Sequence, residues 1–169
     1  MTESEAKEAL LAAGIPSGVL DVWGNVQTRP MGRLQKHPLG IAFGPPNYDV
    51  ADELRSKIPG LRELIPICEQ NGEAVVGYLP GQRHFVRFYY EDGLDGTDAI
   101  EIVGRGYQHF TATILLEYEE AGLTEHYAPL AELLGFHGAL DLRKLLDAEP
   151  YDDDAVKRFH ERLAEDHAP

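Results

Sequence analysis

Side chains that could act as nucleophiles are few in this chain and stand in unfavourable positions. Serine occurs only at Ser4, Ser17 and Ser56, and no G-x-S-x-G motif places one on a strand-to-helix elbow. The single cysteine, Cys68, lies in an apolar run that should raise the pKa of its thiol, whereas a nucleophile needs a lowered pKa. We therefore expect Cys68 to be a buried structural thiol and predict that the chain is not an enzyme.

Metal ligands do not occur at the spacings that metal sites use. The seven histidines form no H-E-x-x-H motif, and a lone cysteine cannot form a C-x-x-C pair. The run 95–98 is rich in carboxylates, but it lacks the alternating acids and the distal Glu of a calcium loop. His160 and His167 could share one helical face, for which an exposed polar surface is the favoured interpretation. No metal and no cofactor are predicted.

Residues 24–48 form the least regular segment, punctuated by glycine and proline. The segment carries the one basic island of the chain, which consists of Arg29, Arg33, Lys36 and His37. A phosphate-binding loop would need clustered glycines between a strand and a helix, and that pattern is missing. A long ordered loop is favoured. A cleft beside it, serving a small hydrolase or a ligand-binding enzyme, remains an alternative.

Negative charge is the strongest feature of the composition, and it is unevenly distributed. The formal net charge is −14, and residues 64–169 hold 21 acids against 8 bases, whereas residues 1–63 hold 8 acids and 7 bases. Such a surface repels nucleic acids and anionic membranes and attracts a basic partner. Simple solubility is the plainer explanation of any one acidic cluster.

The amino terminus and the hydropathy pattern bear on where the protein works. No apolar run approaches the roughly 20 residues that a membrane span needs. The first residues are acidic and lead into a helix, unlike the basic start of a secretory signal. A cytoplasmic location without membrane association is therefore expected.

Local patterns predict a hairpin, a third strand and a helix packed behind them, which is a small α+β core. Turn signals at Asn71-Gly72 and Pro80-Gly81 flank runs that are rich in aromatic and β-branched residues. The predicted strands are residues 73–79, 84–90 and 99–103, and the predicted helix is 107–118. Further helices are expected over residues 5–13 (begun by Glu3 or Ser4), 49–57, 124–134 (capped by Thr124), 139–148 and from 152 onward.

Three stretches of this core resemble the SUKH superfamily, which includes the yeast cell-wall-assembly regulator family and many bacterial toxin-immunity proteins. The first is Leu64-Ile65-Pro66-Ile67, followed by Asn71-Gly72 and a strand. The second is the aromatic strand 85–90, which ends in acids. The third is the run 107–117, in which an aromatic residue precedes an apolar Leu-Leu pair as in the closing helix of that family.

The length of the chain predicts a single domain over residues 1–169. The resemblance, which covers about residues 61–118, implies an α+β fold with a mostly antiparallel sheet of about four to six strands flanked by helices. The core of the domain would be 61–118, and the helix patterns after Gly122 predict a helical C-terminal extension over 123–169, which is longer than the resemblance implies. The resemblance also implies binding without catalysis, because many bacterial members neutralise a cognate toxin, often a nuclease. The oligomeric state stays open.

Acidic residues of the core suggest where such a toxin would bind. Nuclease toxins present basic substrate surfaces, which an acidic protein can cover with fast, electrostatically steered association. The hypothesis is that the partner-binding face includes Glu91, Asp92, Asp95, Asp98 and Glu101. A housekeeping scaffold or regulatory binding domain without a toxin partner is the main alternative.

Overall fold

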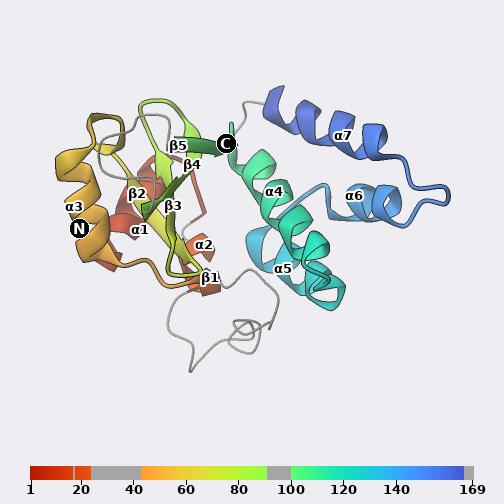
Figure 1. Ribbon diagram of the computed structural model, residues 1–169, viewed down its shortest axis with the longest axis horizontal. Coiled ribbons are helices and arrows are strands. Elements are labelled where there is room, and N and C mark those ends of the chain that lie inside the picture. Colours follow the sequence, from red (N-terminus) through yellow and green to blue (C-terminus); the bar gives the residue numbers. More distant parts are fainter. Residues whose placement is uncertain (17, 24–42, 91–99, 166–169) are drawn as a thin grey trace.

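The computed structural model describes residues 1–16, 18–23, 43–90 and 100–165 (Figure 1). Its centre is one open sheet of five antiparallel strands in the order β1-β2-β3-β4-β5. The predicted α+β class with a mostly antiparallel sheet is therefore confirmed. The strands are β1 (Phe43–Gly44), β2 (Ile65–Gln70), β3 (Ala74–Leu79), β4 (His84–Tyr89) and β5 (Ile100–Gly104).

Helices precede, interrupt and follow this sheet. The three strands predicted from the sequence and the long helix behind them lie where they were expected, within two residues at each end. No helix among the described residues is both long enough and apolar enough to cross a membrane. The helices are α1 (Glu3–Ala12), α2 (Gly18–Trp23), α3 (Tyr48–Lys57), the short 3-10 turns η3 (Pro59–Leu61) and η6 (Thr124–His126), α4 (Tyr107–Glu120), α5 (Tyr127–Leu134), α6 (Ala139–Leu146) and α7 (Asp153–Glu165).

Turn chemistry fixes the register of the two central strand pairs. Asn71 and Gly72 both have positive φ, 56° and 71°, in the tight connection from β2 to β3. The next connection, after Leu79, leads to a pairing of Leu79 with His84. Because side chains alternate along a strand, this register turns Phe85 and Arg87 to one face of the sheet and Val86 and Phe88 to the other.

Both faces of the sheet are covered, one by the predicted helix behind the strands and the other by α3. Phe88 and Val86 belong to a small core with Leu54 of α3, whereas Phe85 belongs to a larger core that includes Leu10 of α1 and residues of α4 and α5. In Figure 1, α3 lies at one end of the molecule and α4 to α7 at the other, with the sheet between them. Because helices pack on both faces, β4 is buried at four consecutive positions.

Stacked aromatic rings join the sheet to α4. The ring of Phe85 lies parallel to that of Phe110, with centroids 4.4 Å apart, and the Tyr78 ring is 4.9 Å from it on the same sheet. Gly104 allows this approach, since a Cβ atom there would lie 2.6 Å from the Cβ of Phe110. The start of α4 is therefore held firmly against the end of β5.

Two helix starts differ from their predicted positions. Thr2, rather than Ser4 or Glu3, caps α1, and it forms a capping box with Glu5. Thr124 opens η6 without capping it, because its hydroxyl donates to the Glu119 carboxylate at 3.1 Å. Helix α7 begins where a helix was predicted, directly after Asp152, whose Oδ1 accepts from the Ala155 N–H at 2.9 Å.

Replacing Thr2 by alanine should lower the free energy of unfolding by about 1 kcal/mol, because the N–H of Glu5 loses its acceptor at the helix start. Urea unfolding followed by circular dichroism measures this. Ser4→Ala is the matched control, since Ser4 is exposed inside the same helix and should lose nothing. Equal losses in the two variants would show that Thr2 does not act as a cap.

Candidate functional site

Only one residue of the predicted acidic face, Glu101, belongs to the part of the chain that the structure describes. Glu91, Asp92, Asp95 and Asp98 lie outside the described residues, as does most of the segment 24–48 considered for a cleft. Glu101 is described, on the edge strand β5, and its side chain is 52% exposed. The neighbouring Ile102 is also exposed. The edge of the sheet therefore presents one acid and one apolar side chain to solvent.

Glu101 forms an ion pair with a buried arginine, Arg87. Arg87 lies directly across from Glu101 in the strand register, and its Nη1 donates to Glu101 Oε2 at 3.2 Å. Its other terminal nitrogen donates to Glu117 Oε1 of α4 at 2.5 Å. The side chain of Arg87 is only 6% exposed. One guanidinium thus links an edge-strand carboxylate to a helix carboxylate, and sequence spacing gave no sign of it.

Arg87 and Glu117 form a mostly buried ion pair, and each affects the pKa of the other. Burial disfavours the charge of Arg87, but the hydrogen bond and charge of Glu117 outweigh it, and the pKa of Arg87 is raised. Burial raises the pKa of the Glu117 carboxyl, against the opposing hydrogen bond from Arg87. Neither group borders one of the cavities found in the described residues. We therefore assign the pair to holding α4 on the sheet.

Cys68 is fully buried, as its apolar neighbours predicted. Burial raises the pKa of the thiol well above its ordinary value. A protonated, inaccessible thiol cannot act as a nucleophile. The predicted burial of Cys68 is confirmed.

Two histidines far apart in sequence meet between α4 and α7. His109 Nε2 lies 3.2 Å from His160 Nδ1, and His160 Nε2 lies 2.8 Å from the hydroxyl of Thr113. The prediction of an exposed polar face for His160 is therefore wrong: the ring is partly buried against α4. Its position four residues after the buried Val156 was the available signal, since that spacing shares a helix face. His167 lies outside the described residues.

The hydrogen bonds around the two rings have one consistent direction. The backbone N–H of Arg105 donates to His109 Nδ1 at 3.0 Å, so the proton of neutral His109 resides on Nε2 and points at His160. His160 then carries its own proton on Nε2, which donates to the oxygen of Thr113. The Thr113 hydroxyl donates in turn to the backbone carbonyl of His109 at 3.1 Å. Every ring nitrogen is thereby satisfied in the neutral state.

This arrangement argues against hydroxyl activation by histidine. A general base must accept a proton from the nucleophile, but the His160 nitrogen facing Thr113 already carries one. Burial is the main cause that lowers the pKa of both histidines, and it lowers that of His109 to about 4. Within the described residues, no group of three or more potential ligands could hold a metal ion. The histidines bind α7 to α4 and leave no group free for acid–base work.

Exposed acids continue along the C-terminal helices, beyond the face predicted from the sequence. Figure 1 shows α6 and α7 at the end of the molecule farthest from α3. The connection between them exposes Tyr151, and α6 exposes Leu140. Several exposed acids of this region make no ion pair with a described residue: Glu120, Glu132, Glu149, Asp153, Asp154 and Glu165.

Comparison with protein-family models, curated proteins and solved structures found no match to this chain.

Proposed function

We propose that this chain is a non-enzymatic immunity protein of the SUKH type, which binds and neutralises a toxin that carries a basic surface. The expected partner is a nuclease or another secreted effector, met in the cytoplasm of the cell that makes both proteins. The five-stranded antiparallel sheet followed by α4 supports this proposal, because it is the fold that the resemblance implies. Neither nucleic acid nor membrane is proposed as a partner.

The unpaired acids of the C-terminal helices are the observation that carries the proposal. Three of the five basic side chains of this region are already engaged, since Arg143 pairs with Glu119 and Asp147, Lys144 with Asp141 and Arg158 with Asp152, whereas Lys157 and Arg162 of α7 form no ion pair with a described carboxylate. The remaining carboxylates keep their charge directed at solvent, where they raise the local concentration of a cationic partner. Tyr151 adds an exposed aromatic side chain of the kind that anchors protein interfaces. The proposed interface combines this surface with the acidic face that includes Glu101.

Charge reversal should slow association with the partner. The tagged full chain is used to capture its partner from source cells, and the gene beside its own is tested as the toxin. A triple variant, Glu149→Lys, Asp153→Lys and Asp154→Lys, should lower the association rate constant at low salt by about tenfold and flatten its salt dependence. A second triple variant, Glu91→Lys, Asp92→Lys and Asp95→Lys, tests the predicted face in the same way. Surface plasmon resonance at several salt concentrations measures both.

The control is a triple reversal of equal charge at exposed acids elsewhere, Glu8→Lys, Glu63→Lys and Glu73→Lys. It separates a local interface from an effect of net charge. If the three triple variants slow association equally, the effect comes from the net charge of the protein alone, and the proposed position of the interface is refuted. A captured partner that is acidic, or a neighbouring gene product whose toxicity the chain does not relieve, would contradict the immunity function itself.

A further inference from the structure

A cavity of about 300 Å³ lies where the β3–β4 turn meets the beginning of α4 and the end of α1. It contains none of the acids assigned to the proposed interface, and neither His109 nor His160 lines it, although the backbone N–H of its lining residue Arg105 donates to His109. Its size is at the lower end of pockets that hold small organic ligands. The lining residues come from α1 and the segment after it (Ala13, Ile15), from β3, β4 and their turn (Tyr78, Gln82, Arg83, His84, Phe85), and from the start of α4 (Arg105, Gly106, Tyr107).

Buried rings and an aliphatic side chain form the floor of this cavity. Ile15, Tyr78, Phe85 and Tyr107 are each less than 5% exposed. The hydroxyl of Tyr107 donates to the Leu134 carbonyl at 2.7 Å in the interior, so Tyr107 offers its ring to the cavity. Burial raises the pKa of that hydroxyl. The floor therefore suits an apolar ring or a short hydrocarbon chain.

Two arginines from different connections stand at the rim. Arg83 ends the β3–β4 turn with a positive φ of 56°, and Arg105 lies between β5 and α4. Both are exposed, and neither forms an ion pair with a described carboxylate. Among the described residues that line the cavity, none is acidic. Arg62, Lys157 and Arg162 also form no ion pair with a described carboxylate, but none of them lines this cavity. The ion-paired Lys and Arg side chains of the described residues are Lys7, Arg55, Lys57, Arg87, Arg143, Lys144 and Arg158.

The absence of lining acids is informative because acids outnumber bases nearly two to one in this chain, 29 against 15. Two arginines without an ion-paired carboxylate stand over an apolar floor and form a positive rim in a negative molecule; Glu161 and Glu165 border a second cavity on the other side of Arg105. The α4 amino end at Gly106 adds to it, since no side chain caps that end. Arginine binds carboxylate and phosphate groups through two parallel hydrogen bonds, which suits such a rim.

We infer that this cavity binds a small organic anion, with an apolar ring or short chain on the aromatic floor and a carboxylate or phosphate group between Arg83 and Arg105. The site is independent of the proposed toxin interface. Binding of such an anion would neutralise the rim and cover the rings of Tyr78 and Tyr107. It would also make the protein a small-molecule binder in addition to its proposed role.

Phenyl phosphate is the probe, and it is titrated into the ¹⁵N-labelled full chain while NMR spectra are recorded. The neutral benzyl alcohol and the cationic benzylamine are titrated in the same way for comparison. Phenyl phosphate should bind saturably and shift the amides of Arg105, Gly106 and Tyr107. The double variant Arg83→Gln, Arg105→Gln should weaken its binding by at least about tenfold. Ala13→Trp, which fills the cavity without changing charge, should abolish it.

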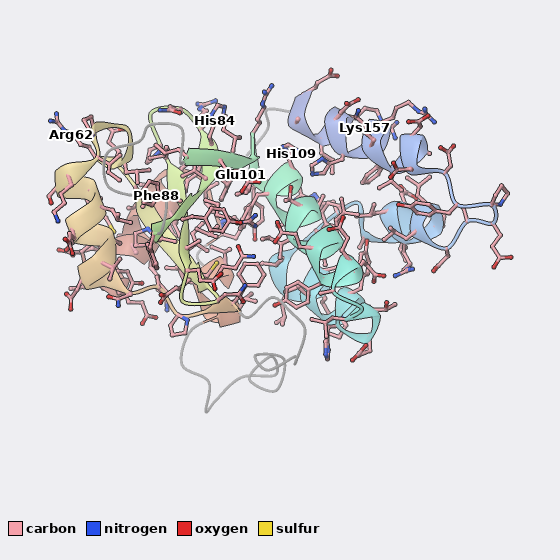
Figure 2. All side chains as sticks on the ribbon, viewed as in Figure 1. Arg62, His84, Phe88, Glu101, His109 and Lys157 are labelled. Atoms are coloured by element: carbon pink, nitrogen blue, oxygen red, sulfur yellow. The ribbon has the colours of Figure 1, made fainter. Side chains whose placement is uncertain are left out.

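Arg62→Gln is the matched control, because Arg62 is an exposed, unpaired arginine outside the cavity (Figure 2). Binding should be unchanged in this variant, and circular dichroism establishes that each variant is folded. The inference is overturned if phenyl phosphate binds no better than benzyl alcohol or benzylamine. It is equally overturned if Arg62→Gln weakens binding as much as the double variant does, or if Ala13→Trp leaves binding intact in a folded protein.

Discussion

Replacing Arg87 by methionine should destabilise the fold by about 3 to 5 kcal/mol, the largest loss that we expect from a single substitution. Methionine keeps most of the volume of the side chain but leaves the Glu117 carboxylate partly buried without its cation. Burial already raises the pKa of Glu117, and removing Arg87 removes the interaction that opposes this rise. Urea unfolding at neutral pH, monitored by tyrosine fluorescence and circular dichroism, measures the loss.

The double variant Arg87→Met, Glu117→Leu decides whether the loss comes from the stranded charge. Removing both charges leaves an apolar contact, so we expect the double variant to recover most of the stability lost in Arg87→Met. Arg158→Met is the control, since Arg158 makes an exposed ion pair with Asp152 at 3.6 Å and should cost less than about 1 kcal/mol. If Arg87→Met is as mild as this control, or if Glu117→Leu adds to its loss, the ion pair does not hold α4 on the sheet.

Local periodicity accounts for what could be predicted from the sequence. The run from Glu73 to Tyr118 alternates between turn signals and apolar stretches, and each signal acts over a few residues. Strands β3 to β5 and helix α4 were therefore found. Helix α2 was not assigned, because its six residues are too few for a helical period to differ from a strand period.

Long-range pairing accounts for what could not be predicted. Arg87 and Glu117 are 30 residues apart, and His109 and His160 are 51 apart, so no local window contains both partners. The cover that α3 provides for the second face of the sheet depends on topology in the same way. The sequence indicates the net charge of the chain but not which charged side chains pair with one another. Glu101 was expected to face a partner protein, and the structure shows that it already forms an ion pair with Arg87.

Acidification should weaken the attachment of α7, because the histidine pair is satisfied only when both rings are neutral. A proton on His109 Nδ1 would displace the hydrogen bond from the Arg105 N–H, and a proton on His160 Nδ1 would displace the one from His109. The nearby charges act in both directions: Arg105 lowers the pKa of His109, and Glu161 raises that of His160. Burial outweighs Glu161, and the pKa of His160 remains below its ordinary value.

The pH window of this effect follows from the pKa of His109 in the two states. Its pKa is about 4 in the folded protein against 6.5 for an ordinary histidine. Between these values the unfolded chain binds a proton that the folded chain does not, so the free energy of unfolding falls as the pH falls. The contribution of His109 is fully present above 6.5 and is lost as the pH approaches 4. Allowing for partial exposure of the ring, we expect a loss of about 2 kcal/mol.

The variant His109→Gln tests this, because glutamine can still donate to His160 but does not titrate. We expect the stability difference between neutral pH and about pH 5 to be smaller in this variant than in the wild type, by about 1 to 2 kcal/mol. His137→Gln is the control, since His137 is exposed and only its backbone N–H is bonded, to Gln108. All other titrating groups are common to the three proteins and cancel in the comparison.

Hydrogen exchange should show faster opening of α7 than of α4 in acid, because α7 depends on the pair and α4 is also held by Arg87. Parallel stability curves for the wild type and His109→Gln would show that the histidines do not respond to acid as a pair.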